Sequence, residues 1–193
     1  MEVKDATLVG FSMGGGEAAR YMARHGGAGV SKVAFVSAVT PYLLKTEDNP
    51  EGAERSVFDE MVEGLRADRA HFLAGFGGKF YGAGLLTSPV SSEVMEWTFQ
   101  MAMMGSLKAT LDCVRSFSET DFRADLQGIR VPTLVIHGDA DKAVPLESSG
   151  ARTAQLVQGA KLVVYQGEPH GLQMTAKDRL VADLTAFARS GKI

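Results

Sequence analysis

Four short apolar segments, separated by stretches with helical periodicity, constrain the fold of this chain most strongly. They are residues 6–11, 32–39, 130–138 and 160–167. The second, "KVAFVSAV", is continuous and branched without alternation of polarity, which is typical of a strand buried on both faces of a sheet. Strands that alternate with helices form a parallel sheet with helices packed on its faces. We therefore predict an α/β fold with roughly four parallel strands and flanking helices.

Three segments predict the helices of this sheet. Residues 14–25 follow the first strand and carry alanines and a methionine at helical spacing. Residues 145–157 lie between the third and fourth strands, and residues 175–190 follow the fourth. In the last segment Thr175 and Asp178 form a capping-box pattern, so we expect this helix to begin at Thr175.

Residues 41–125 interrupt the alternation of strands and helices with several helical stretches and glycine-rich connections. Because ligands bind at the carboxyl ends of parallel strands, we expect an insertion at that edge to cover a site. We therefore divide the chain into a core, residues 1–40 and 126–193, and a helical cap, residues 41–125. The large apolar residues of one cap segment either line a pocket or, as we expect for most of them, form the core of the cap: Met95, Trp97, Phe99, Met101, Met103 and Met104.

Ser12 lies between the first strand and its helix in the pattern G-x-S-x-G, residues 10–14. The pattern alone is a weak signal, but a strand before it and a helix after it are the context in which it marks a nucleophile. A turn this sharp strains the serine backbone, and neighbouring residues must lack side chains where strand and helix approach closely. The amino-terminal end of the helix also points amide donors toward a reacting carbonyl.

An acid and a base follow the last two strands. Asp139 and Asp141 come after the third strand and His170 after the fourth, so all of them lie at the same edge of the sheet as Ser12. His170 would take the proton of Ser12, and a carboxylate would orient the imidazole. Asp139 directly follows Gly138 and is well placed to bind amides of its own turn, so we favour Asp141 as the acid.

The remaining histidines and the single cysteine are predicted to be structural. His137 lies inside the end of the third strand, His25 ends a helix and His71 belongs to the cap. Cys113 has no partner for an internal disulfide and is expected to be a small core residue.

Charge and hydropathy exclude other classes of function. A net charge of −3 and a pI near 5.8 provide no basic field for nucleic acid or an anionic membrane. The start "MEVKDATLVG" has no basic region followed by an apolar one, and no apolar run approaches the length of a membrane span. We expect a cytoplasmic protein that acts on a small molecule without a metal or other cofactor.

Taken together, the stretches "LVGFSMGGGEAARY", "FSETDF", "VPTLVIHGDADKAVP" and "PHGL" resemble the cofactor-free bacterial haloperoxidases and arylesterases of the α/β-hydrolase superfamily. The resemblance extends over nearly the entire chain. By position it implies that Ser12 is the nucleophile, Asp141 the acid and His170 the base, and that the Met13 amide is one oxyanion donor.

The resemblance also implies an activity. It implies hydrolysis of small aryl or alkyl carboxylic esters through an acyl-enzyme. Hydrogen peroxide would be an alternative nucleophile, giving the perhydrolase and non-haem chloroperoxidase side activity. Phe11 and Trp97 are candidate substrate contacts at this site.

The chain departs from the family pattern before Ser12, where family members carry roughly eighty more residues. Those residues supply part of the sheet and the second oxyanion donor. The strand carrying Ser12 is therefore expected to present an exposed edge, which recruits other strands, and we predict a homodimer or higher homo-oligomer. Alternatives are a weakly active or inactive truncated remnant and one half of a split enzyme that a partner chain completes.

Overall fold

The computed structural model of the chain describes residues 3–84 and 88–193. Its centre is a sheet of four parallel strands, as predicted, and the strand order is β1-β2-β3-β4. The strands are β1 (Ala6–Phe11), β2 (Val30–Val36), β3 (Thr133–Gly138) and β4 (Lys161–Tyr165). Residues 1–2 of the predicted core and 85–87 of the predicted cap lie outside the described residues.

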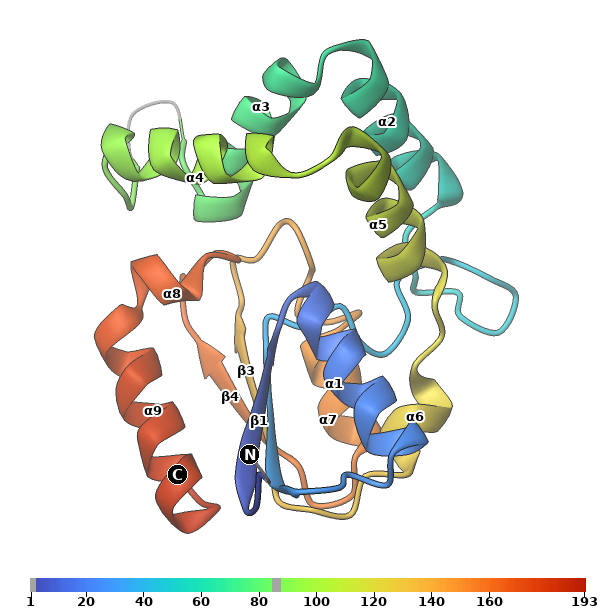
Figure 1. Ribbon diagram of the computed structural model, residues 1–193, viewed down its shortest axis with the longest axis vertical. Helices are drawn as coiled ribbons and strands as arrows, with labels where there is room; N and C mark the ends of the chain where they lie inside the picture. Colours follow the sequence, from blue (N-terminus) through green and yellow to red (C-terminus); the bar gives the residue numbers. More distant parts are fainter. Residues whose placement is uncertain (1–2, 85–87) are drawn as a thin grey trace.

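Helices cover both faces of the sheet (Figure 1). One face carries α1 (Met13–Arg24), α6 (Arg123–Gln127) and α7 (Gly150–Leu156). The opposite face carries α9 (Lys177–Ser190), with α8 (Leu172–Thr175) just before it.

Side chains of the two central strands divide between the two faces with a period of two residues. On β2, Val33 and Phe35 join the apolar cluster on the α1 side, whereas Ala34 and Val36 join the cluster that includes Leu180 and Phe187 of α9. Both faces are therefore buried, which explains why this strand is apolar throughout its length.

The segment between β2 and β3 forms further helices that lie beyond the carboxyl ends of the strands (Figure 1). They are α2 (Arg55–Ala67), α3 (Arg69–Tyr81), α4 (Ser92–Met104) and α5 (Leu107–Glu119). Three of them begin at a side chain that caps an amide of the first turn: Asp68 for α3, Ser91 for α4 and Ser106 for α5. None of the described helices is both long and apolar enough to cross a membrane.

The predicted start of the last long helix is wrong. Thr175 does not begin the last long helix; it belongs to α8, where its hydroxyl donates to the Gly171 carbonyl, and α9 begins at Lys177. The short helix α8 intervenes because the chain must turn from the end of β4 back onto the sheet.

The expected core role of α4 is wrong for Trp97, Met101 and Met104, whose side chains are exposed, Met104 to 85%. α4 packs mainly against α3, so most of its circumference faces away from the sheet.

The strand that carries the G-x-S-x-G pattern lies at one edge of the sheet. Among the described residues β1 pairs with β2 alone, and Val9 in its middle is 45% exposed. An apolar edge strand with free amide and carbonyl groups is a template for pairing with another chain.

We predict that the 20.6 kDa chain self-associates through this edge. Sedimentation velocity over a dilution series should show a dimer or larger species at micromolar concentration. Val9→Lys should shift the distribution toward monomer, whereas Val181→Lys, at an exposed position of α9, should leave it unchanged. A compact monomer at every concentration would contradict this prediction.

Candidate active site

Ser12 occupies the turn that joins β1 to α1. Its backbone has φ 51° and ψ −122°, a region that residues with a side chain rarely adopt. Hydrogen bonds to β2 and to the residues after it hold this conformation. The Ser12 amide donates to the Val36 carbonyl at 3.0 Å, and the Ser12 carbonyl accepts from the Val39 amide at 3.1 Å. The strain is therefore supported by the parallel neighbour strand, which fixes the hydroxyl at the edge of the sheet.

The glycines around Ser12 do not all have the same steric role. A Cβ at Gly10 would lie 2.6 Å from the Gly14 carbonyl oxygen, and one at Gly15 would lie 2.4 Å from the Ala38 Cβ. A Cβ at Gly14 would meet nothing within 4 Å. The expectation that side chains are excluded is therefore confirmed at Gly10 and Gly15 but is wrong at Gly14, the last glycine of the pattern.

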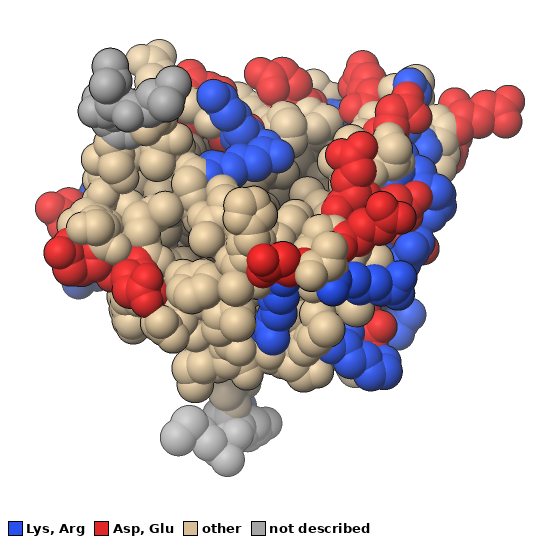
Figure 2. Space-filling view, turned by 90° about the horizontal axis from the view of Figure 1, so that it is seen from above, with Lys and Arg blue, Asp and Glu red and all other residues tan. Residues whose placement is uncertain are grey.

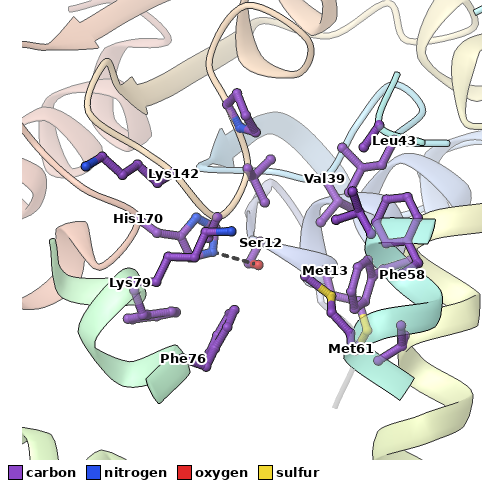
Figure 3. Close-up of a pocket in the computed structure, with 18 of the residues that line it drawn as sticks. Ser12, Met13, Val39, Leu43, Phe58, Met61, Phe76, Lys79, Lys142 and His170 are labelled. Carbon is purple, nitrogen blue, oxygen red and sulfur yellow. Dashed lines mark hydrogen bonds between the residues drawn. The ribbon is translucent and has the colours of Figure 1, made fainter. Parts of the chain in front are cut away.

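His170 connects the serine to the acid loop. Its Nε2 lies 2.9 Å from Ser12 Oγ (Figure 3). Its Nδ1 lies 2.6 Å from Asp141 Oδ2. The carboxylate can only accept, so Nδ1 carries the proton and Nε2 is free to accept the Ser12 hydroxyl proton. The structure thus brings together Ser12, Asp141 and His170, three residues that the sequence analysis selected.

The imidazole of His170 is buried between aromatic rings. Phe11 lies at 5.2 Å and Phe80 at 5.0 Å between ring centroids. The Gly171 amide also donates to the Phe80 carbonyl at 2.9 Å, so the loop that carries His170 is attached to α3. Phe11, a predicted substrate contact, therefore lies against the base.

Asp141 is buried and fully engaged in hydrogen bonds. Its Oδ1 accepts from the amides of Ala143 at 2.9 Å and Val144 at 2.8 Å. Burial acts most strongly on the carboxyl and raises its pKa, but hydrogen bonds from His137, His170 and the backbone together outweigh burial and lower the pKa to about 2. Asp141 is therefore ionised over the whole range in which a histidine base can act.

Asp139 has a different position. It is exposed, and its Oδ1 accepts from the Gly167 amide at 2.6 Å, joining the loop after β3 to the loop after β4. This differs from the expected bond within its own turn, because the Ala140 and Asp141 amides of that turn already donate to the Glu168 and Gly138 carbonyls. The geometry brings Asp141, and not Asp139, to His170.

A cavity of about 720 Å³ opens beside Ser12 and His170. Its wall is mostly apolar and includes Val39, Leu43, Phe58 and Met61, while Lys79 and Lys142 lie on the side of His170 (Figure 3). Met13 also lines it and is the first residue of α1, so its amide has no partner within the helix. The two predicted substrate contacts, Phe11 and Trp97, are not among the residues that line the cavity, and Trp97 is 59% exposed on α4.

The sequence analysis missed the aromatic wall that α3 supplies. Phe72, Phe76 and Phe80 recur every four residues and all line the cavity. Residues at this spacing share one face of a helix, so the pattern could have identified them. Cys113, expected in the core, is half-buried on α5 and also lines the cavity.

The face of the molecule seen from above the cap carries both signs of charge. Lys and Arg lie among Asp and Glu, and no continuous basic surface covers this face (Figure 2). Within residues 3–84 and 88–193, no group of three or more His, Cys, Asp and Glu side chains is arranged to hold a metal ion.

Comparison with known families agrees with the fold of the chain. A family model described as "alpha/beta hydrolase fold" matches residues 2–177. The chain belongs to the α/β-hydrolase family. Its relatives place it among the bacterial non-haem haloperoxidases and the esterases similar to them. A putative non-heme chloroperoxidase of a Synechocystis species is 41% identical over 181 residues, which cover 93% of this chain and 65% of the relative.

Two further relatives carry esterase or peroxidase names. A bifunctional esterase/perhydrolase of Acinetobacter calcoaceticus is 42% identical over 97% of this chain and 68% of its own length. The crystal structure of a bromoperoxidase from Bacillus anthracis superposes with a TM-score of 0.94 at 43% identity, covering 98% of this chain and 69% of that protein. The chain thus spans about two thirds of the length of the relatives that it matches.

The low pKa of Asp141 predicts a loss of stability in acid. The pKa in the folded state, about 2, lies below the unfolded value of 3.8, so the stabilisation is complete above about pH 5 and is lost as the pH falls through the folded pKa. The expected contribution is about 2 kcal/mol. Urea unfolding between pH 6 and pH 2 should show a steeper decline in the parent chain than in Asp141→Asn, in which other carboxyl groups with lowered pKa values, such as Glu119 and Asp121, still contribute. Parallel pH dependence in the two proteins would contradict the prediction.

Proposed function

We propose that this chain carries the catalytic site of a serine hydrolase that cleaves small aryl and alkyl carboxylic esters through an acyl-enzyme. The observation that carries the proposal is the continuous series of hydrogen bonds from Ser12 Oγ through His170 to Asp141 at the mouth of an apolar cavity. A serine hydroxyl is a weak nucleophile until an adjacent base accepts its proton, and the base requires an orienting partner.

In the proposed reaction, Ser12 Oγ attacks the ester carbonyl as its proton passes to His170 Nε2. Asp141 stabilises the resulting imidazolium through the Nδ1 proton without itself becoming protonated. The Met13 amide, at the amino-terminal end of α1, donates to the oxyanion. Collapse of the tetrahedral intermediate breaks the ester bond, and the alcohol leaves with the proton from His170.

The second half of the reaction repeats these transfers with water. His170 removes a proton from water, whose oxygen attacks the acyl carbonyl, and the bond to Ser12 Oγ breaks with return of the proton to the serine. The cavity supports an apolar acyl or aryl group, because aromatic and aliphatic side chains such as Phe58, Phe76 and Met61 line it.

Perhydrolysis is a second candidate activity. It is favoured by relatives named as a bifunctional esterase/perhydrolase and as non-heme chloroperoxidases. Hydrogen peroxide would replace water as the nucleophile, so that the acyl-enzyme releases a peracid, and the peracid would oxidise halide. The same serine, base and acid serve both reactions.

We predict that Ser12→Ala and His170→Ala each lower kcat for a chromogenic short-chain ester by about 10⁴-fold or more, because a nucleophile and its base act as one unit. Ser190→Ala, which removes an exposed hydroxyl at the end of α9, serves as the matched control and should keep the parent rate. Ester hydrolysis at the parent rate by purified Ser12→Ala protein would rule out the assignment, and no turnover by the parent chain would favour the inactive alternative.

The two aspartates should respond differently to the same substitution. Asp141→Asn is expected to lower turnover by about 10⁴-fold, since an amide at this position favours the wrong tautomer of His170. Asp139→Asn should leave turnover nearly unchanged and lower the free energy of unfolding by about 1 kcal/mol, through a weaker bond to the Gly167 amide. Steady-state kinetics and urea unfolding of both variants measure these effects. A large loss of turnover confined to Asp139→Asn would reverse the assignment.

A further inference from the structure

His137 is a fully buried imidazole at the end of β3 that the proposed reaction does not use. Its Nε2 lies 2.8 Å from the Val144 carbonyl oxygen and 3.3 Å from Asp141 Oδ2. A carbonyl oxygen can only accept a hydrogen bond, so Nε2 must carry a proton. His137 therefore donates to Val144 and has the carboxylate of Asp141 as a second, longer neighbour.

The opposite side of the ring is closed by α7. Among the described residues His137 Nδ1 has no hydrogen-bond partner. A Cβ at Gly150, the first residue of α7, would lie 2.5 Å from this nitrogen, so the backbone packs directly against it. A proton on Nδ1 would have no acceptor there, and the Val144 carbonyl would lose its donor. The surroundings thus favour the tautomer with the proton on Nε2.

The contacts of His137 complete a closed ring of interactions that includes Asp141 and Val144. Asp141 Oδ1 accepts hydrogen bonds from the amides of Ala143 and Val144. His137 Nε2 donates to the carbonyl of the same Val144. Asp141 Oδ2 is thereby left to face His170 Nδ1 at 2.6 Å. Without the bond to the carbonyl, the loop after β3 would keep the Asp141 amide bond to Gly138 but lose the hydrogen bond that ties Val144 to β3.

We propose that His137 is a positioning residue, which fixes the Asp141 loop through its Nε2 proton and so holds the carboxylate in register with His170. The charge environment agrees with this role. Burial is the largest influence on Asp141 and raises its pKa, but the hydrogen bond from His137 is foremost among the interactions that lower it. An apolar residue would fill the same space on β3 but would leave a buried carbonyl without a donor.

The test compares two substitutions at this position with a control on the same strand. His137→Gln keeps an N–H donor near the position of Nε2, whereas His137→Leu keeps the volume but removes the donor. Val135→Ala, at a buried residue of β3 in the cluster on the α1 side, lowers stability without removing a hydrogen bond of the loop. All measurements are made well below the unfolding temperature of each protein.

Kinetics form the first readout and rest on the proposed function. His137→Leu should lower kcat for the ester by about 10- to 100-fold with little change in KM, because a small displacement of the acid misorients the base without altering the cavity. His137→Gln should recover most of the loss, and Val135→Ala should keep the parent kcat. A parent kcat in His137→Leu, or an equal loss in His137→Leu and Val135→Ala, would overturn the proposal.

The second readout is independent of activity. The ¹⁵N chemical shift of His170 Nδ1 reports its hydrogen bond to Asp141, and it should change in His137→Leu but stay near the parent value in His137→Gln and Val135→Ala. An unchanged shift in His137→Leu would show that His137 only fills space, even if the chain proved inactive toward esters. A changed shift in a chain without esterase activity would support the positioning role and count against the proposed function alone.

Discussion

Parallel pairing of the strands determines where every group of the site lies. Phe11 at the end of β1 is opposite Val36 of β2, and Gly138 at the end of β3 is opposite Tyr165 of β4. Because the strands end in register, the turns that follow them meet at one edge. The hydrogen bond between Ser12 and His170 joins residues 158 positions apart in the sequence, and it exists only because of this alignment.

The site is also held by the layers that surround the sheet. The strained turn at Ser12 is bonded to β2 and to the residue Val39 after it, and the loop of His170 is bonded to α3. The helices beyond the strand ends supply one wall of the cavity and the attachment of the His170 loop, so the cavity wall and the position of His170 are coupled through α3. The bonds to Val36 and Val39 account for a serine held in a backbone conformation that would be unfavourable in isolation.

Much of this architecture follows from local patterns in the sequence. The apolar strands, their parallel order and the proximity of Ser12, Asp141 and His170 could be predicted, because strand ends in a parallel sheet converge whatever the details of packing. The choice of Asp141 over Asp139 also agreed with the geometry.

Features that depend on contacts between distant segments could not be predicted in the same way. The capping pattern at Thr175 failed because α8 intervenes. Trp97, Met101 and Met104 of α4 are exposed because that helix packs mainly against one neighbour. From the sequence, His137 was predicted to be only a structural residue of the strand. Nothing in its local pattern indicates that its ring would bind the carbonyl of Val144 in the following loop. The aromatic residues of α3 were detectable by their spacing, but which face they present depends on the packing of the cap.

The most direct test of the central claim is mass spectrometry of the chain after rapid acid quenching during turnover of a slowly hydrolysed aryl ester. The account predicts an increase in mass by one acyl group, carried by the peptide that contains Ser12 and absent from His170→Ala. An acyl group on any other residue, or ester consumption without a covalent intermediate, would contradict it.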